Sequence, residues 1–302
     1  MRIAVTGASG FIGGHLVAHL EARGDAVGRV ARPFVRDTLS AAFAGVDVVV
    51  HVAGVVSAMD ERAYVDGNVT ATRIVAEAAR DAGVRLVHVS SLAAAGPASP
   101  RRPRVEDDPP APINAYGRSK LAGEEALKRT DGLRWTILRP GVVYGPRDRA
   151  LLPLFVLSRR GMLPLVGRPT AAYTLIHVDD VVRAIAAAVD RGASGDTIFL
   201  GHRDPVATRA LLEAVREAAG GRAAIIPIPR LLVRLAAWGG DAATAMTRRR
   251  PLIDSRRYVE LYAEGFVCRV DRLRDRLGAE AQIQLADGLT RTARWYESQG
   301  WL

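Results

Sequence analysis

The sequence predicts an α/β protein in which a parallel sheet is followed by a smaller, mainly helical C-terminal lobe. Short β-branched runs alternate with longer amphipathic stretches from residue 2 onward, a pattern typical of strand–helix–strand units. A glycine-rich turn directly follows the first run. After about residue 201 the alternation weakens and longer segments rich in Ala, Leu and Arg begin, which indicates the second lobe.

Each element follows from its local pattern. The segment 46–51 is apolar on nearly both faces, as a buried parallel strand should be. By length and composition, strands are predicted over 3–6, 26–31, 46–51, 86–90, 136–139 and 197–200. Helical spacing of apolar residues predicts helices over 11–23, 65–82, 116–129, 151–160 and 178–191. Two long segments rich in Ala, Leu and Arg lie near 208–219 and 230–250. Five prolines predict a surface loop over 98–112.

The composition excludes several classes of protein. The chain has 302 residues, of which 49% are hydrophobic and 25% charged, and this balance excludes disordered, collagen-like and coiled-coil proteins. No stretch reaches the roughly 18 uncharged apolar residues of a spanning helix. The lone Cys268 has no internal disulfide partner, and the first apolar run is too short for a secretory leader. We therefore expect a cytoplasmic protein without an integral membrane segment.

Arginine carries nearly all of the positive charge. Lysine occurs only at Lys120 and Lys128 among the 42 cationic residues, and the formal net charge is +10. The dense basic runs, 101–104 and 248–250, lack the interleaved aromatics of a base-stacking surface, so no nucleic-acid partner is expected. The segment from Leu231 to Trp238 has leucines and a tryptophan at helical spacing. Packing within the lobe is the simpler interpretation of that face, and contact with a membrane or a partner is the alternative.

A glycine turn joins the first predicted strand to the first predicted helix. It reads Thr-Gly-Ala-Ser-Gly-Phe-Ile-Gly over 6–13. Gly7 allows a tight turn, Gly10 lets backbone amides approach a pyrophosphate, and Gly13 allows close packing of the helix. The helix N-terminus adds oriented N–H groups and a partial positive charge. The position of the glycine turn between a strand and a helix predicts a dinucleotide site in a doubly wound Rossmann sheet.

The end of the second predicted strand bears on the choice of dinucleotide. An acid about 20 residues after the glycines would bind the adenosine ribose, but the sequence has Arg32 there, followed by proline. An arginine favours a 2′-phosphate, with Arg36 as an additional cation, so NADP is expected ahead of NAD. His15 and His19 lie one helical turn apart, but no Glu or third His lies nearby, and no metal site is expected.

A tyrosine, a lysine and a serine form the candidate catalytic set. Tyr116 and Lys120 are four residues apart, which places them on one face of a predicted helix. A neighbouring cation stabilises a phenolate and so lowers the pKa of a tyrosine. Ser91 follows a predicted strand, at the edge where open α/β sheets bind ligands, and its hydroxyl would hold a substrate oxygen beside the tyrosine.

These motifs together resemble the extended short-chain dehydrogenase/reductase family, in its hydroxysteroid-dehydrogenase and dihydroflavonol-reductase-like branch. The resemblance extends over nearly the whole chain, through segments 6–13, 51–54, 68–72, 89–91, 116–120, 138–146 and 176–180. It implies that Tyr116 is the acid/base, that Lys120 binds the nicotinamide ribose and lowers the pKa of Tyr116, and that Ser91 polarises the carbonyl or alcohol of the substrate. It also implies a homodimer formed through the helices around 65–82 and 116–129.

The resemblance and the residue patterns together give a set of expected cofactor contacts and a domain division. Residues 1–146 with about 176–201 are expected to bind NAD(P), and 147–175 with 202–302 to bind the substrate. Apolar residues of this lobe suit an apolar molecule, although most are expected in its core: Leu152, Leu154, Phe155, Leu163, Leu165, Trp238, Tyr258, Tyr262 and Phe266. The expected cofactor contacts are Gly7, Ser9, Gly10, Phe11, Ile12, Gly13, Arg32, Val52, Ala53, Gly54, Asn68, Tyr116, Lys120, Pro140, Val142 and Val143.

Two departures from the family pattern bear on function. The usual second helix and third strand are expected to be compressed into 33–38. Val142 and Tyr173 stand where nucleotide-sugar epimerases of the family carry an Asn and an Arg. The leading hypothesis is therefore hydride transfer between NAD(P) and a secondary alcohol or ketone of a fairly apolar small molecule. The alternatives are a nucleotide-sugar epimerase or dehydratase with tightly bound NAD, and a non-catalytic nucleotide-binding subunit or redox sensor.

Overall fold

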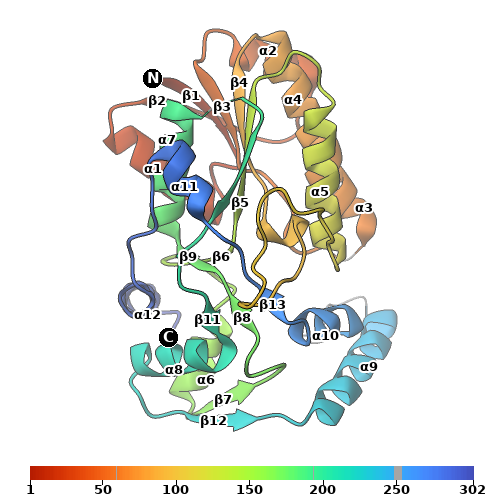
Figure 1. The fold of residues 1–302 in the computed structure, drawn as a ribbon, viewed down its shortest axis with the longest axis vertical. Coiled ribbons are helices and arrows are strands. Elements are labelled where there is room, and N and C mark those ends of the chain that lie inside the picture. The colour runs from red at the N-terminus through yellow and green to blue at the C-terminus, as the bar shows by residue number, and fades with distance from the viewer. Residues whose placement is uncertain (59, 193, 248–253) are drawn as a thin grey trace.

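A six-stranded parallel sheet organises the fold (Figure 1). The computed structural model describes residues 1–58, 60–192, 194–247 and 254–302. The strand order is β2-β1-β3-β4-β5-β10, and the six predicted strands of this sheet are confirmed. The bounds are β1 (Arg2–Thr6), β2 (Ala26–Val30), β3 (Val48–His51), β4 (Arg85–Val89), β5 (Trp135–Pro140) and β10 (Asp196–Leu200).

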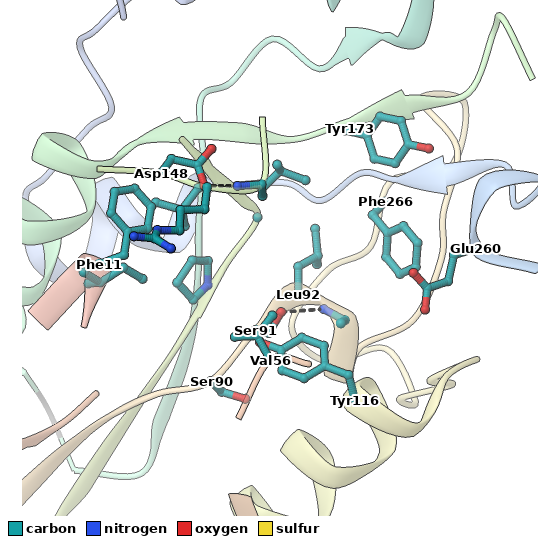
Figure 2. Close-up of a pocket in the computed structure, with 18 of the residues that line it drawn as sticks. Phe11, Val56, Ser90, Ser91, Leu92, Tyr116, Asp148, Tyr173, Glu260 and Phe266 are labelled. Atoms are coloured by element: carbon teal, nitrogen blue, oxygen red, sulfur yellow. Dashed lines mark hydrogen bonds between the residues drawn. The ribbon is translucent and has the colours of Figure 1, made fainter. Parts of the chain in front are cut away.

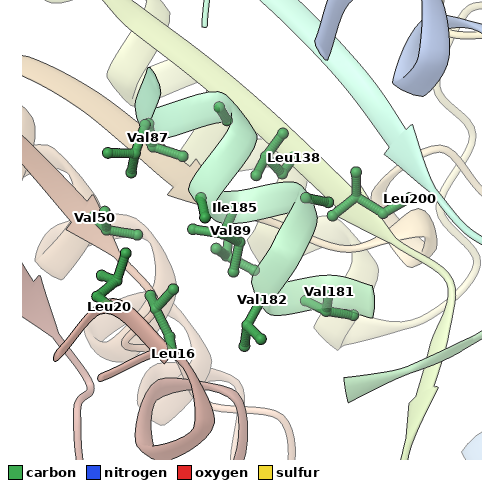
Figure 3. Packing of buried hydrophobic residues seen from close by; sticks show 14 of the residues in the cluster. Leu16, Leu20, Val50, Val87, Val89, Leu138, Val181, Val182, Ile185 and Leu200 are labelled. Atoms are coloured by element: carbon green, nitrogen blue, oxygen red, sulfur yellow. The ribbon is translucent and has the colours of Figure 1, made fainter. Parts of the chain in front are cut away.

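Helices cover both faces of this sheet, which confirms the doubly wound fold. One face packs against α1 (Phe11–Ala22), α7 (Val178–Arg191) and α11 (Asp271–Leu277), and the other against α2 (Arg36–Phe43), α4 (Ala71–Asp81) and α5 (Ala115–Lys128). On the first face, Leu16, Leu20 and Ile185 lie fully buried against Val50 and Val87 (Figure 3). Because strands buried on both sides must be apolar on both sides, their near-continuous Val and Leu content follows from this layering.

The strands that follow β1 in the sequence lie on both sides of it in the sheet. The chain continues to β2 on one side of β1 and later returns to β3 on the other side, so the strand order reverses at β1. Ligands of open α/β sheets bind in the crevice outside the carboxyl ends of the strands at such a point. The glycine turn over 6–13 and the residues after His51 therefore flank the predicted dinucleotide crevice.

Two predicted elements differ from the structure. The segment 33–38 was expected to hold a compressed helix, whereas α2 runs from Arg36 to Phe43 and buries Leu39 and Phe43 against α4. The predicted helix over 65–82 is divided: a π-helical segment, η1 (Val65–Thr70), follows the short α3 (Glu61–Tyr64) and precedes α4. Wide turns of this kind often accompany functional sites, and this one carries Asn68.

Smaller elements lie beyond the carboxyl ends of the main strands (Figure 1). The helix predicted over 151–160 is confirmed. Helices also occupy the Ala/Leu/Arg-rich segments near 208–219 and 230–250, and the second is described as far as Thr247. The strand pairs are β6 (Val142–Tyr144) with β9 (Leu175–His177), β7 (Met162–Leu165) with β12 (Ala224–Pro227), and β8 (Ala172–Tyr173) with β11 (Val206–Ala207) and β13 (Gly265–Phe266). The helices are η2 (Leu92–Ala94), α6 (Leu152–Arg159), α8 (Thr208–Ala218), α9 (Arg230–Thr247), α10 (Ser255–Leu261) and α12 (Leu285–Ser298).

These elements have cores of their own. Phe155 and Tyr296 pack edge to face with ring centroids 5.3 Å apart, and Val215 and Leu289 complete the cluster. In contrast, α11 packs against α7 and β10, so its leucines join the core of the main sheet. Among the helices that the structure describes, none combines the length and apolarity needed to cross a bilayer.

Candidate active site

The glycine turn is shaped as a dinucleotide cradle. Gly7 has a positive φ of 73°, and a Cβ there would lie 2.6 Å from the backbone nitrogen of Ala53. A Cβ on Gly13 would lie 2.0 Å from the Gly7 carbonyl oxygen, so the helix could not approach the turn with any larger residue. On Gly10 a Cβ would meet only the Gly7 carbonyl oxygen, at 3.2 Å, which leaves the other side of the turn open for a phosphate. These positions fit a bound dinucleotide.

Asn68 fixes the loop that follows β3. Its Oδ1 accepts a hydrogen bond from the Val55 nitrogen at 2.7 Å, and its Nδ2 donates to the Val55 carbonyl at 2.8 Å and to Ser119 Oγ at 2.9 Å. A Cβ on Gly54 would lie 3.1 Å from Asn68 Oδ1 and 3.7 Å from Lys120 Nζ. Asn68 therefore joins this loop to α5, and its side chain is already engaged within the protein.

Tyr116 and Ser91 meet at the wall of a pocket (Figure 2). Tyr116 is in the first turn of α5, which Asn114 caps by accepting a hydrogen bond from Gly117 at 2.6 Å. Burial raises the pKa of the Tyr116 phenol, and a hydrogen bond with the Ser91 hydroxyl opposes part of that rise. The phenol therefore stays protonated at neutral pH, and the expected lowering of its pKa by Lys120 is wrong for this structure because burial dominates.

Lys120 lies beneath the loop that carries Gly54. It is 4% exposed, and its Nζ donates to the Val89 carbonyl at 2.9 Å. Burial lowers the pKa of Lys120 to about 8, although the carboxylate of Glu124 opposes the change. The ammonium is thus charged at neutral pH, with unused donors in a buried position next to the cradle.

A buried ion pair holds α5 against β5. Arg139 donates from Nε to Glu124 Oε1 at 2.9 Å and from Nη2 to Oε2 at 2.6 Å, and Ser90 Oγ also donates to Glu124. The two charged side chains are 5% and 0% exposed. The Ser90 hydroxyl is therefore engaged by this pair, whereas the Ser91 hydroxyl meets Tyr116. The fork geometry fixes α5 relative to the sheet, and with it the position of Tyr116.

Two stacked, buried histidines lie close enough to Lys120 to feel its charge. His51 bonds to Thr6 Oγ1 at 2.6 Å and to Thr72 Oγ1 at 3.2 Å, and it stacks on His88 with ring centroids 5.2 Å apart. Burial, and then the charge of Lys120, lowers the pKa of His51 to about 3 and that of His88 well below its usual value. Both rings are therefore neutral at neutral pH and do not repel the ammonium.

The pocket has a volume of about 880 Å³ and lies between the main sheet and the smaller elements. It brings together eight of the residues predicted for the site: Ser9, Phe11, Ile12, Ser91, Tyr116, Pro140, Val142 and Val143. The remaining predicted residues lie behind its walls or along the crevice. Of the apolar residues predicted for the substrate lobe, Phe266 lines the pocket, whereas Phe155, Leu163 and Leu165 are buried in cores.

Sequence reasoning missed the residues that close the pocket from the C-terminal part of the chain. Trp295 and Trp301 contribute aromatic walls, with ring centroids 4.9 Å apart. Arg149 stacks on Trp301 at 4.9 Å, and Arg147 adopts a left-handed backbone with φ of 72°. A strained non-glycine residue in a pocket is a feature of functional sites. No local motif marks these residues, because only the tertiary fold brings them to Tyr116.

The two arginines expected near the adenosine ribose lie in different environments. Arg32 is exposed at the carboxyl end of β2, and its Nη2 donates to the Gly67 carbonyl at 3.2 Å. Arg36 is bound to Asp81 on α4 through Nε at 2.7 Å and Nη2 at 2.6 Å. Its guanidinium is therefore held by α4, and Arg32 is the better placed of the two for a 2′-phosphate. His15 bonds to the Pro146 carbonyl at 2.9 Å.

The doubly wound sheet with a glycine cradle at its switch point defines a Rossmann-type dinucleotide-binding protein. Residues 3–201 match the model of the NAD dependent epimerase/dehydratase family, and the chain belongs to that family. The chain is 29% identical to the ceramide reductase of Caulobacter vibrioides over 99% of its own length and 96% of that protein.

Two further proteins are similar over nearly their full lengths. A 4-hydroxy-2-methyl-3-oxo-4-farnesyl-3,4-dihydroquinoline-1-oxide ketoreductase of Stigmatella aurantiaca is 30% identical over 96% of this chain and 95% of that protein. The crystal structure of a dTDP-glucose 4,6-dehydratase double mutant from Streptomyces venezuelae, with NAD bound, matches at a TM-score of 0.80 and 27% identity over 100% of this chain and 98% of that one. The family therefore contains both reductases and enzymes of nucleotide sugars.

Proposed function

We propose that the protein is an NADP-dependent reductase acting on the ketone of a fairly apolar small molecule. The observation that carries this proposal is the meeting of the Ser91 hydroxyl and the Tyr116 phenol at the wall of a pocket that the apolar residues Val142 and Val143 also line. When bound along the glycine cradle, the cofactor supplies the hydride. The chain itself must then supply a proton, a hydrogen bond to the carbonyl oxygen, and a pocket that excludes water.

Tyr116 and Ser91 have complementary tasks. The Ser91 hydroxyl donates a hydrogen bond to the substrate oxygen and so orients the carbonyl. Tyr116 passes its phenolic proton to that oxygen as the C–O double bond becomes a single bond, and the resulting alkoxide leaves as the alcohol. Lys120 remains charged in its buried position next to the glycine cradle, where it would hold the nicotinamide ribose of the cofactor. The pair Glu124–Arg139 holds α5, and therefore Tyr116, in place.

The pKa of Tyr116 favours the reductive direction. Reduction needs a neutral phenol as the proton donor, whereas oxidation of an alcohol needs a phenolate as the base. Because burial raises the pKa of Tyr116, the neutral form predominates at neutral pH. Reduction therefore starts from the form of the enzyme that is already populated.

The pocket supports an apolar or amphipathic substrate. Phe266, Tyr173 and Leu92 contribute ring and aliphatic surface to the pocket that Tyr116 lines (Figure 2). Arginines at 147, 149 and 257 add positive charge at its edge. Two of the similar proteins are named as a ceramide reductase and as the ketoreductase of a farnesyl-dihydroquinoline oxide. We assign the substrate to this class: a ketone on a long apolar group that carries a polar end.

A screen tests this function. Purified enzyme is mixed with NADPH and a panel of long-chain, steroidal and short water-soluble ketones, and loss of NADPH absorbance is followed together with formation of the alcohol. We expect turnover that rises with apolar length. A panel in which every ketone is inert, while a nucleotide sugar is converted without added cofactor, would contradict it.

Arg32 is expected to select the phosphorylated cofactor. Arg32→Gln removes the exposed guanidinium at the end of β2, and we expect NADPH to bind about 10–100-fold more weakly while NADH binding changes less than about twofold. The matched control is Arg29→Gln within β2, because the Arg29 guanidinium pairs with Glu21 at 2.7 Å. Fluorescence titration with both cofactors measures the effect. An equal loss for NADH and NADPH would show that Arg32 does not read the 2′-phosphate.

The second candidate function is conversion of a nucleotide sugar with retained NAD. The pocket arginines at 147, 149 and 257 favour it, because guanidinium groups bind diphosphates well. Against it stands Tyr173, a phenol in the pocket wall where related epimerases carry an arginine. Acid denaturation of the purified protein distinguishes the two, since a retained-cofactor enzyme releases stoichiometric NAD and the proposed reductase releases little.

The remaining assignments follow from the same arrangement. We propose that 1–146 with about 176–201 binds the cofactor and that 147–175 with 202–302 selects the substrate, apart from α11, which packs with the main sheet. A homodimer through α4 and α5 and a cytoplasmic location remain predictions.

A further inference from the structure

Helix α9 leaves a large apolar face uncovered. Over 230–241, the part of α9 whose burial is described, the residues buried against the rest of the protein form a narrow stripe of one valine and two small residues: Val233, Ala237 and Gly240. The opposite side carries Leu231, Leu232, Leu235 and Trp238, which are 63%, 55%, 49% and 53% exposed, and we call these four the α9 apolar face. Packing within the lobe, the simpler expectation from sequence, is therefore wrong for them. A contiguous exposed patch of this kind marks an interaction site.

Positive charge borders the α9 apolar face. The Arg234 guanidinium lies 4.7 Å from the ring centroid of Trp238, and Arg230 lies 5.0 Å from that of Tyr262 while donating to Tyr258 Oη at 2.8 Å. Asp241 is the acidic residue among 230–241, and it is bonded to Ser255. An apolar stripe with tryptophan at its edge and arginines beside it has the composition of a helix lying in a membrane interface.

Helix α9 packs on a helix, α10, that borders the candidate active site. α9 packs on α10 through the Arg230–Tyr258 and Asp241–Ser255 contacts, and the two helices lie side by side at one end of the molecule (Figure 1). On α10, Arg257, Glu260 and Leu261 line the pocket. A surface that docks on α9 would therefore lie near the pocket residues of its neighbouring helix.

We propose that the α9 apolar face docks the protein on the surface of an anionic phospholipid bilayer. Charge complementarity selects this occupant. A second copy of the chain would bring the arginines of two like faces together and would carry the same net charge of +10, whereas anionic headgroups attract both. The leucines and Trp238 enter the boundary between headgroups and acyl chains, and Arg230 and Arg234 remain at the phosphates. This inference stands on the surface alone and does not depend on the proposed reductase activity.

Vesicle binding tests the proposal. Full-length protein is sedimented with vesicles of phosphatidylglycerol and phosphatidylcholine, or of phosphatidylcholine alone. We expect strong binding to the anionic vesicles, weaker binding to the neutral ones, and at least a tenfold loss in the variant Leu235→Glu/Trp238→Glu. The double variant Arg230→Gln/Arg234→Gln should bind the anionic vesicles more weakly than the wild type does but bind the neutral vesicles equally well. Its binding to the anionic vesicles should also depend less on salt concentration. The matched control is Val35→Glu, an exposed apolar residue next to α2 at the opposite end of the molecule, which should bind like the wild type (Figure 1).

Two further measurements separate this proposal from other accounts. Circular dichroism and NADPH binding of the Leu235→Glu/Trp238→Glu variant should match the wild type, so that a loss of vesicle binding is not a loss of fold. Sedimentation equilibrium should show no self-association that this variant abolishes. The proposal is overturned if the wild type ignores anionic vesicles, if the variant binds them equally well, or if the face instead holds two copies of the chain together. Failure of the ketone screen with intact vesicle binding would overturn only the proposed function.

Discussion

The Tyr116→Phe variant is expected to lose about 10²–10⁴-fold in kcat for ketone reduction while binding NADPH as tightly as the wild type. Phenylalanine keeps the ring, which lies 6.4 Å from the ring of Tyr64, but removes the phenolic proton that meets Ser91. Without that donor the developing alkoxide must take its proton from water, which is a far weaker acid than a positioned phenol. Steady-state kinetics and a cofactor titration measure the two quantities separately.

Two controls make this prediction specific. Tyr64→Phe removes a phenol oxygen from the neighbouring ring and should change kcat by less than about threefold. Ser91→Ala should lower kcat/KM without removing the proton donor, so its loss should be smaller than that of Tyr116→Phe. If Tyr116→Phe retained more than a tenth of the wild-type kcat, another group would have to supply the proton and the assignment of Tyr116 would be wrong.

Replacing Lys120 with methionine is expected to abolish turnover and to make the protein more stable. Burial lowers the pKa of Lys120 from an ordinary value near 10.5 to about 8, so charging the folded side chain below pH 8 costs on the order of 3 kcal/mol. Methionine fills similar space without that cost, and the lost bond to the Val89 carbonyl offsets about 1 kcal/mol of the gain. The expected net effect is a Tm higher by roughly 5 °C at pH 7.

The pH dependence follows from the same shift. Between pH 8 and 10.5 the folded protein binds fewer protons at this site than the unfolded chain, so this group makes the wild type more stable as the pH rises through that interval. The advantage of Lys120→Met should therefore fade between pH 8 and 10.5. In the wild type, kcat/KM should fall above about pH 8, as Lys120 loses the charge with which it would hold the cofactor ribose.

The other lysine provides the matched control. Lys128 is exposed at the end of α5, with its ammonium 5.5 Å from the ring centroid of Trp135. Lys128→Met should leave kcat and the pH profile unchanged and should not raise the Tm. Thermal unfolding across pH 7 to 11 decides the matter, and a Lys120→Met variant less stable than the wild type at pH 7 would show that the buried charge stabilises the fold.

The main sheet could be predicted from sequence because buried parallel strands and glycine turns are encoded locally. The run from Val48 to Val50 is apolar on both faces. A side chain at Gly7 or Gly13 would collide with neighbouring backbone atoms, so glycine is required at both positions. The same locality explains the agreement over α1 and α7. α2 was placed too short because its support comes from Leu39 and Phe43, two apolar residues among polar ones, and only their packing on α4 makes them a core face.

Some residues of the candidate site could be predicted from sequence motifs, and others could not. Tyr116 and Ser91 stand in short motifs, so their meeting at the pocket was predictable, whereas Trp295 and Trp301 reach the pocket from the C-terminal segment without any motif. The pKa of Tyr116 was predicted in the wrong direction, because sequence spacing indicates the neighbouring lysine but not the depth of burial. The exposure of α9 was missed for the same reason, since periodicity alone does not show which apolar face the lobe covers.

Transfer of deuterium tests the central claim most directly. The protein is incubated with NADPH that carries deuterium at the reactive C4 position and with the ketones that the screen selects, and mass spectrometry follows both products. The account predicts an alcohol that carries one deuterium at the carbinol carbon, formed by the wild type and by Tyr64→Phe and nearly absent with Tyr116→Phe. An alcohol without deuterium, or equal labelling by Tyr116→Phe, would contradict it.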